Sequence, residues 1–227
     1  MLSALSRAIG QLSAPALRRV VVLSLVLSLA SFILVWLGVA YLLARTTLFG
    51  WQPLNWLVDL LGALAVLVLS WLLFPAVATI IMGLFLDRVA AAVEALDYPG
   101  RGPARRAPVG EIIGITLRLM ALTLLLNLLA LPVYVLVPGV NFFVFLGLNG
   151  YLFGREYFEV VALRRLDPAA MGAMRQRFAG RVFLAGVAIA GLFALPLVNL
   201  LTPVIATAFM VHLFEGFRRL EPGTAAC

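Results

Sequence analysis

The chain has no lysine, a single histidine and a single cysteine, and these absences restrict its chemistry. The lone cysteine, Cys227, excludes an internal disulfide and a cysteine-based metal site. His212 has no partner cluster of histidine, cysteine and carboxylate side chains, so we expect no metal and no cofactor. A lone histidine on an apolar helix is more often packed or hydrogen-bonded than a ligand. The glycines lack the spacing of a phosphate-binding loop, and no catalytic constellation is visible, so we expect a protein that is not an enzyme.

Charge is also scarce, because only 12% of the 227 residues are charged whereas 64% are hydrophobic. The mean hydropathy of +1.10 lies far above that of a soluble domain. We therefore predict an all-α integral membrane protein without a separate soluble domain. All 17 basic residues are arginine, and the net charge is +7. The arginines flank apolar segments and form no patch interleaved with aromatics, which argues against nucleic-acid binding.

Two apolar runs are long enough to cross a bilayer. Val20 to Ala44 would form about 37 Å of helix, and a hydrocarbon core is about 30 Å thick. This run is too long for the apolar part of a signal peptide, so we expect an uncleaved anchor. Leu60 to Leu86 is also long enough, with a kink expected at Pro75 and a helical continuation to about Leu96. Before both runs, apolar residues at helical spacing in 1–16 predict an interfacial helix.

Four later apolar arms are shorter, at about 17 to 23 Å of helix each. They are Leu119–Leu131, Val140–Gly154, the residues between Arg181 and Pro196, and Val204–Phe214. We expect two re-entrant hairpins that turn at Pro132 and Pro138-Gly139 and at Pro196 and Pro203. Backbone groups at such turns need protein or water partners, so the tips should be buried or line a passage. The alternative is four full crossings, with Arg118 and Arg181 snorkelling.

The predicted fold is therefore two transmembrane helices plus two half-penetrating (re-entrant) helical hairpins and an N-terminal interfacial helix, in a single membrane domain over 1–227. Its parts are an interfacial helix at 1–16, a first crossing at 17–45, a second crossing with a cytoplasmic extension at 57–96, and hairpins at 111–166 and 175–220. Only Arg45 falls on the far side of the membrane, whereas most other arginines share one side. Both termini should therefore be cytoplasmic.

Arg18 and Arg19 are the strongest anion-binding candidates. Two guanidiniums at the start of a crossing helix can donate several charge-assisted hydrogen bonds to a tetrahedral oxyanion, along with the free N–H groups of the first turn. On physical grounds alone, such a pair is more often a topology signal. The helix N-termini expected after Pro138-Gly139 and after Pro203 are further places that favour an anion.

Charged and amide side chains near the first hairpin form a second candidate group. Arg155 and Glu159 are four residues apart, so a helix puts these opposite charges on one face. They form either a salt-bridged helix end or a charged vestibule. Asparagines in or beside apolar runs commonly hold helices together, and those next to the turns have two other possible roles: they satisfy carbonyl groups freed by the turn or contact a passing solute. The candidate vestibule or pore-lining residues are Arg118, Asn141, Arg155, Glu156 and Asn199.

Four segments, in the same order over nearly the whole chain, resemble the CysZ sulfate permeases, which are grouped with the etoposide-induced-protein family. They are the proline-apolar-Arg-Arg opening at Pro15–Arg19, the GLF-containing segment Phe74–Glu94, the VPGVN turn Val137–Asn141, and LPLVNLLTPVIATAF at Leu195–Phe209. No one of these motifs is diagnostic, but together they are fairly specific.

The resemblance implies a bacterial inner-membrane protein that carries sulfate inward for cysteine synthesis. It also implies two transmembrane helices, two pairs of half-penetrating helices, and oligomers built from dimers. The family's sulfate-binding arginine pair corresponds to Arg18 and Arg19. Two departures affect the substrate: the loop Asp97–Gly110 is short, and the hairpin exit at 154–159 is more charged than is usual.

We therefore predict sulfate or a related oxyanion as the substrate, membrane lipids as partners, and a homo-oligomer that binds no nucleic acid. The alternative is a non-transporting scaffold or lipid-organising protein of the same family, in which the arginines bind headgroups.

Overall fold

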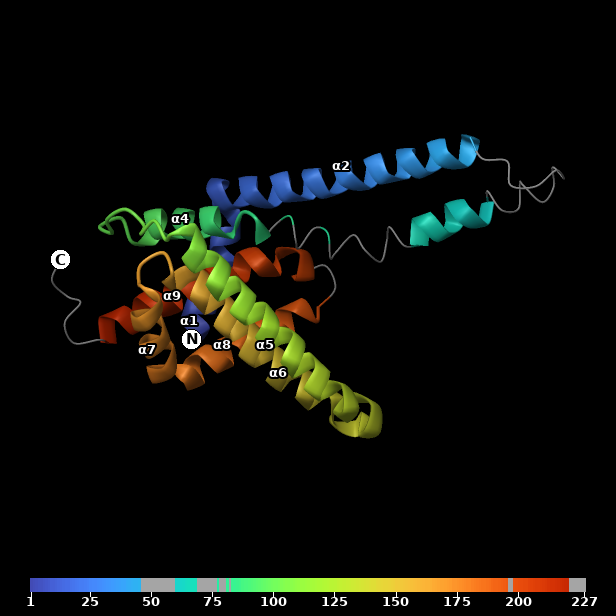
Figure 1. The fold of residues 1–227 in the computed structure, drawn as a ribbon. Coiled ribbons are helices and arrows are strands. Elements are labelled where there is room, and N and C mark those ends of the chain that lie inside the picture. Colours follow the sequence, from blue (N-terminus) through green and yellow to red (C-terminus); the bar gives the residue numbers. More distant parts are fainter. Residues whose placement is uncertain (46–59, 69–76, 78–80, 82, 196–197, 221–227) are drawn as a thin grey trace. The chain divides into compact units, whose positions relative to one another are not determined.

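The computed structural model describes residues 1–45, 60–68, 77, 81, 83–195 and 198–220, and these residues form helices and turns without any strand (Figure 1). This confirms the predicted all-α fold. The chain divides into two compact units, which we call the first unit (Met1–Leu17 with Leu86–Cys227) and the second unit (Arg18–Phe85). The kink predicted at Pro75 and the turn predicted at Pro196 lie outside the described residues.

The second unit contains most of α2 (Pro15–Arg45) and a helical segment at 60–68. Pro15 occupies the first helical position, where its missing N–H costs no hydrogen bond. Pro15–Gly38 is long and apolar enough to cross a membrane. A turn at 84–85 interrupts the helix that the sequence predicted to run on to Leu96, and α4 begins after it. The prediction of one continuous helix is therefore wrong at 84–85. Apolar residues after the turn are again at helical spacing, so the sequence pattern gave no sign of the turn.

The first unit holds the remaining elements. They are α1 (Leu2–Gly10), η1 (Gln11–Ser13), α4 (Leu86–Asp97), α5 (Val109–Leu136), η2 (Pro138–Val140), α6 (Asn141–Ala162), α7 (Pro168–Arg177), α8 (Ala179–Phe193) and α9 (Val198–Leu220). The central helix is α9, against which α1, α4, α6 and α8 pack. Of the most apolar stretch of α9, 83% is buried inside the protein, whereas only 6% of the corresponding stretch of α5 is buried. Thus α9 forms the core, and α5 presents its apolar side chains outward.

Helices α6 and α8 cross in close backbone contact. A Cβ built on Gly186 would lie 1.8 Å from the carbonyl oxygen of Gly150, and one built on Gly154 would lie 2.4 Å from that of Val182. Small residues let helices approach this closely in membrane proteins. Beside the crossing, the rings of Phe178 and Phe217 stack with centroids 4.4 Å apart.

The first predicted hairpin has longer arms than expected. Helix α5 runs unbroken through Arg118 and Pro132, and its 28 residues span about 42 Å, while the 22 residues of α6 span about 33 Å. The prediction that the arms are too short to cross is therefore wrong for α5, whereas α6 is not among the described helices that are long and apolar enough to cross a membrane. The reversal comes at η2, at the predicted Pro138-Gly139, where α5 and α6 meet at the far end of this unit (Figure 1).

The first arm of the second predicted hairpin is α8, and α7, which precedes it in the chain, meets it at an angle of 86°. The Asp167 carboxylate caps α7 by accepting hydrogen bonds from the N–H groups of Ala169 and Ala170, both at 2.9 Å. Helix α8 has 15 residues, about 22 Å, which is shorter than the hydrocarbon core, as predicted.

Helix α9 begins at Val198 and continues through Pro203. The turn and helix N-terminus predicted at Pro203 are therefore wrong. A proline inside a helix removes one hydrogen bond and bends the chain. Here Pro203 is buried, and the Thr207 hydroxyl donates to its carbonyl oxygen at 2.8 Å. Packing thus holds the helix together across the proline.

Candidate functional site: an arginine-lined cleft

Arg18 and Arg19 lie in the N-terminal part of α2, and both are exposed. Neither guanidinium forms an ion pair or hydrogen bond with any residue that the structure describes.

The predicted vestibule residues are not gathered in one place. Asn141 begins α6, and Arg155 follows it by about 21 Å along the same helix. The Nδ2 group of Asn141 donates to the Tyr134 carbonyl oxygen at 3.2 Å, as predicted for an amide beside a turn. Arg118 is exposed on α5, and Asn199 is half-buried in the first turn of α9.

Arg155 and Glu159 form the predicted ion pair, with 2.7 Å between Nε and Oε1. Glu156 is exposed and forms no ion pair among the described residues. The salt-bridged helix end of the sequence prediction is thus present at Arg155 and Glu159.

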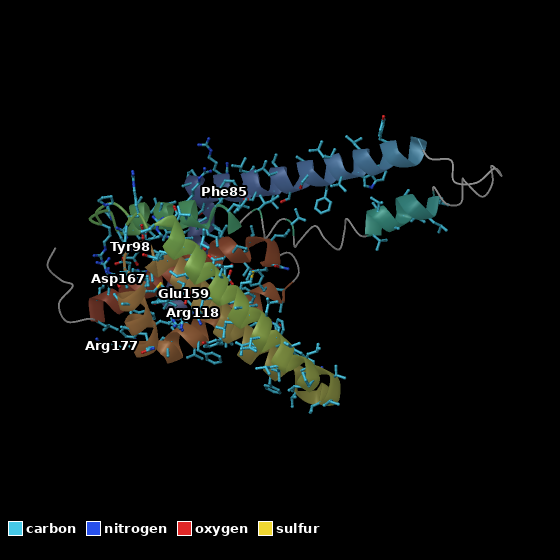
Figure 2. All side chains as sticks on the ribbon, in the orientation of Figure 1. Phe85, Tyr98, Arg118, Glu159, Asp167 and Arg177 are labelled. Atoms are coloured by element: carbon cyan, nitrogen blue, oxygen red, sulfur yellow. The ribbon has the colours of Figure 1, made fainter. Side chains whose placement is uncertain are left out.

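A strongly charged cavity lies elsewhere in the first unit, in a cleft of about 240 Å³ at the end where α4, α6 and α9 meet the loop 98–108. It is lined by Gly100, Arg101, Gly102, Pro103, Arg105, Arg164, Arg165 and Arg218. Five arginines and no acidic residue therefore form its wall. Figure 2 shows Tyr98 and Asp167, next to the loop and to the α6–α7 turn, at this end of the unit.

The loop 98–108 is held over the C-terminal end of α6 by hydrogen bonds. Nη1 of Arg165 donates to the carbonyl oxygens of Gly102 and Pro103 at 2.6 and 3.3 Å. The backbone N–H of Arg105 donates to the Arg164 carbonyl oxygen at 2.8 Å. Prolines and glycines keep this loop from becoming helical, so its carbonyl groups are free to accept these bonds.

Carboxylates behind the wall fix the guanidiniums. Glu94, which is 5% exposed, accepts from Arg164 at 3.1 Å and from both Nε and Nη2 of Arg165 at 3.2 and 2.7 Å. Two hydrogen bonds from one guanidinium to one carboxylate set the plane of the arginine. Burial raises the pKa of Glu94, but the hydrogen bonds from Arg165 and Arg164 outweigh it, so the net pKa is below its ordinary value.

The other cleft arginines are paired in the same way. Glu215, 1% exposed, accepts from Arg101 and, at 3.4 Å, from Arg218. Glu111 accepts two hydrogen bonds from Arg105, at 2.6 and 2.7 Å. Asp87 accepts from Arg164. The five arginines line the cavity, whereas none of these carboxylates does, so the cleft favours an anion.

From sequence alone, Arg101, Arg105 and Arg218 count only as topology signals. They belong to three segments that are far apart in the chain, and only the fold brings them together. The available signal was that arginine pairs recur between or after the apolar runs, at 105–106, 164–165 and 218–219.

His212 is packed and hydrogen-bonded, in line with the more common role of a lone histidine. The Nε2 atom of Gln11 donates a hydrogen bond to Asp97 at 2.7 Å. The other amide atom of Gln11, Oε1, therefore accepts a hydrogen bond from Nε2 of His212 at 3.1 Å. Nδ1 of His212 then accepts from the Tyr98 hydroxyl at 3.0 Å. This network ties η1 to α4 and α9. Within the described part of the chain, no group of three histidine, cysteine or acidic side chains could hold a metal ion.

Three of the described helices are long and apolar enough to cross a membrane, namely Pro15–Gly38 of α2, α5 and α9. A helical chain of this kind is an integral membrane protein. Residues 4–203 match the family model described as Sulfate transporter CysZ/Etoposide-induced protein 2.4, and the chain belongs to this family. The resemblance noted in the sequence is thus confirmed. No curated protein matches the chain.

Proposed function

We propose that this protein carries sulfate across the bacterial inner membrane and feeds cysteine synthesis. Membership of the sulfate transporter family supports this function. The observation that carries the proposal is the cleft of the first unit, whose wall presents five arginines and no carboxylate. Planar guanidiniums present paired donors that suit tetrahedral oxyanions.

The cleft arginines are held by carboxylates, and this limits how tightly an anion binds. A transport site must bind its ion strongly enough to admit it and weakly enough to release it. Because the four paired carboxylates Glu94, Glu215, Glu111 and Asp87 neutralise most of the charge of the five arginines, the net attraction is modest. In the proposed mechanism the cleft lies on the sulfate route at the arginine-rich, cytoplasmic end of the first unit, with both chain termini on the same side.

Arg18 and Arg19 recruit the dianion in this proposal. Both are exposed near the N-terminal end of α2, where the unpaired N–H groups and the helix dipole add to the attraction. Their guanidiniums make no ion pair with any described residue, unlike those of the cleft.

We also propose that the first hairpin is re-entrant. Arg118 to Leu136 covers about 27 Å of α5, and no charged residue occurs from 119 to 154. At the tip, Leu136 and Phe143 are 76% and 72% exposed. An apolar, exposed tip without charge favours a turn that stays in hydrocarbon over one that emerges into water. The exposed apolar side chains of α5 then face lipid or another copy of the chain in a homo-oligomer.

Sulfate uptake into proteoliposomes tests the function. The wild-type protein should take up radiolabelled sulfate well above empty liposomes, with weaker competition from chloride than from unlabelled sulfate. Arg18→Gln/Arg19→Gln should lower uptake at least about tenfold, because at least one charge-assisted contact, worth about 1.5 to 3 kcal/mol, is lost. Uptake equal to that of empty liposomes would contradict transport, and unchanged uptake by the folded double variant would remove the pair from the mechanism.

A further inference from the structure

A second cavity of the first unit, distinct from the arginine-lined cleft, combines cationic and apolar walls. It is a groove of about 330 Å³ between α6, α7 and α8. Tyr151 and Arg155 come from α6, Arg175 and Gln176 from α7, and Val182 and Phe183 from α8. Apolar surface dominates its lining, whereas polar surface dominates that of the cleft.

The groove lies at the corner where α7 and α8 meet at 86°. Helix α7 is polar and ends in Arg175 and Arg177, whereas α8 is almost entirely apolar after Arg181. If α8 enters the hydrocarbon, α7 must run along the membrane surface, so the corner between them lies where headgroups meet acyl chains.

One end of the groove is cationic. Arg155 bonds to Glu159 at 2.7 Å, and Nε of Arg175 lies 3.9 Å from the same oxygen, too far for a hydrogen bond. This Nε atom is buried and has no hydrogen-bond partner among the described residues. Glu159 is 5% exposed and does not line the groove. Arg155 and Arg175 line the groove and Glu159 does not, so the charged groups that a ligand would meet at this end are guanidiniums.

The other end is aromatic and apolar. The side chains of Tyr151 and Phe183 are 39% and 38% exposed, and Val182 is buried beneath them at 4%. Tyrosine and phenylalanine exposed next to arginine are typical of sites at the membrane interface. A small inorganic anion would contact the arginines and leave this apolar wall exposed, whereas a lipid contacts both ends.

We propose that this groove binds an anionic phospholipid, with its phosphate at Arg155 and Arg175 and an acyl chain along Tyr151 and Phe183. The charge favours anionic over zwitterionic headgroups. The bound lipid would fill the corner between α7 and α8 and fix the angle at which α8 enters the membrane. This site is independent of sulfate transport, since it involves neither the cleft arginines nor Arg18 and Arg19.

Native mass spectrometry of the full chain in neutral detergent tests the proposal, with phosphatidylglycerol as the probe and phosphatidylcholine of the same acyl chains for comparison. Phosphatidylglycerol should be retained more strongly. Arg175→Gln should lower its affinity about tenfold through the loss of one charge-assisted contact, while the Arg155–Glu159 pair is kept. Arg177→Gln is the matched control, because Arg177 lies on the same helix over the Phe178 ring and outside the groove.

A second variant separates a lipid from a free anion. Phe183→Ala should also weaken phosphatidylglycerol binding, and inorganic phosphate in excess should not displace the lipid. The proposal is overturned if both lipids bind alike or if Arg175→Gln binds like Arg177→Gln. Displacement by inorganic phosphate, with no effect of Phe183→Ala, would equally overturn it in favour of a free-anion site. The sulfate-uptake variant Arg18→Gln/Arg19→Gln should retain lipid binding, which keeps this test separate from that of transport.

Discussion

At the scale of single residues, the first unit depends on buried carboxylates that each serve more than one arginine. Glu94 accepts from Arg164 and Arg165, and Glu215 accepts from Arg101 and Arg218. Removing one partner of a buried ion pair leaves an uncompensated charge, which costs far more than the pair itself contributes. These two glutamates should therefore be among the least replaceable polar residues of the chain.

Glu94→Gln should destabilise the protein by about 3 kcal/mol, because two largely buried guanidiniums lose their shared anion. Thermal unfolding in detergent measures the change. Glu156→Gln serves as the control, since Glu156 is exposed and has no ion-pair partner among the described residues. Equal unfolding temperatures for the two variants would contradict the assigned role of Glu94.

The pH dependence of stability follows from the same residue. The pKa of Glu94 is lower in the folded protein than its ordinary value of 4.5. A carboxylate with a lowered pKa stabilises the fold above its ordinary pKa, and this contribution is lost as the pH falls through the folded-state value. Wild-type stability should thus decrease below about pH 4.5, and Glu94→Gln should show a shallower decrease over that range, as measured by unfolding at stepped pH.

At the scale of helices, the crossing of α6 and α8 has no room for a side chain. Gly186→Ala should destabilise the first unit by about 1 to 3 kcal/mol, because its Cβ would overlap the Gly150 carbonyl oxygen and push the helices apart. Gly191→Ala, also on α8, meets nothing within 4 Å and should be neutral or slightly stabilising. Similar unfolding temperatures for the two variants would show that the crossing is looser than described.

The ends of the helices were harder to predict than their apolar character. Hydropathy identified α2, α8 and the apolar residues of α5 and α9, because a helix that lies in lipid must carry apolar side chains. Arg118, Pro132 and Pro203 were taken as boundaries, yet helix continues through all three. An arginine does not end a helix, and a proline costs an interior position about 3 kcal/mol, which packing against neighbouring helices can offset. That packing is set by tertiary structure.

At the scale of the whole molecule, the family could be recognised from the sequence, but the arginine-lined cleft could not. The family's motifs occur in the same order along this chain, so the resemblance to the family could be recognised from the sequence. The ion pairs of the cleft instead join residues such as Asp87 and Arg164, 77 positions apart, and Arg101 and Glu215, 114 apart. Sequence periodicity carries no information at such separations, so sequence alone gave Arg18 and Arg19 but not the cleft.

The central claim is that sulfate passes the arginine-lined cleft, and sulfate uptake by two neighbouring arginine variants tests it most directly. Arg105 lines the cleft, whereas Arg106 is exposed and does not. In proteoliposomes of equal protein content, Arg105→Gln should lower the initial rate of sulfate uptake about tenfold through the loss of one charge-assisted contact, while Arg106→Gln retains the wild-type rate. Equal rates for Arg105→Gln, Arg106→Gln and the wild-type protein would contradict the claim.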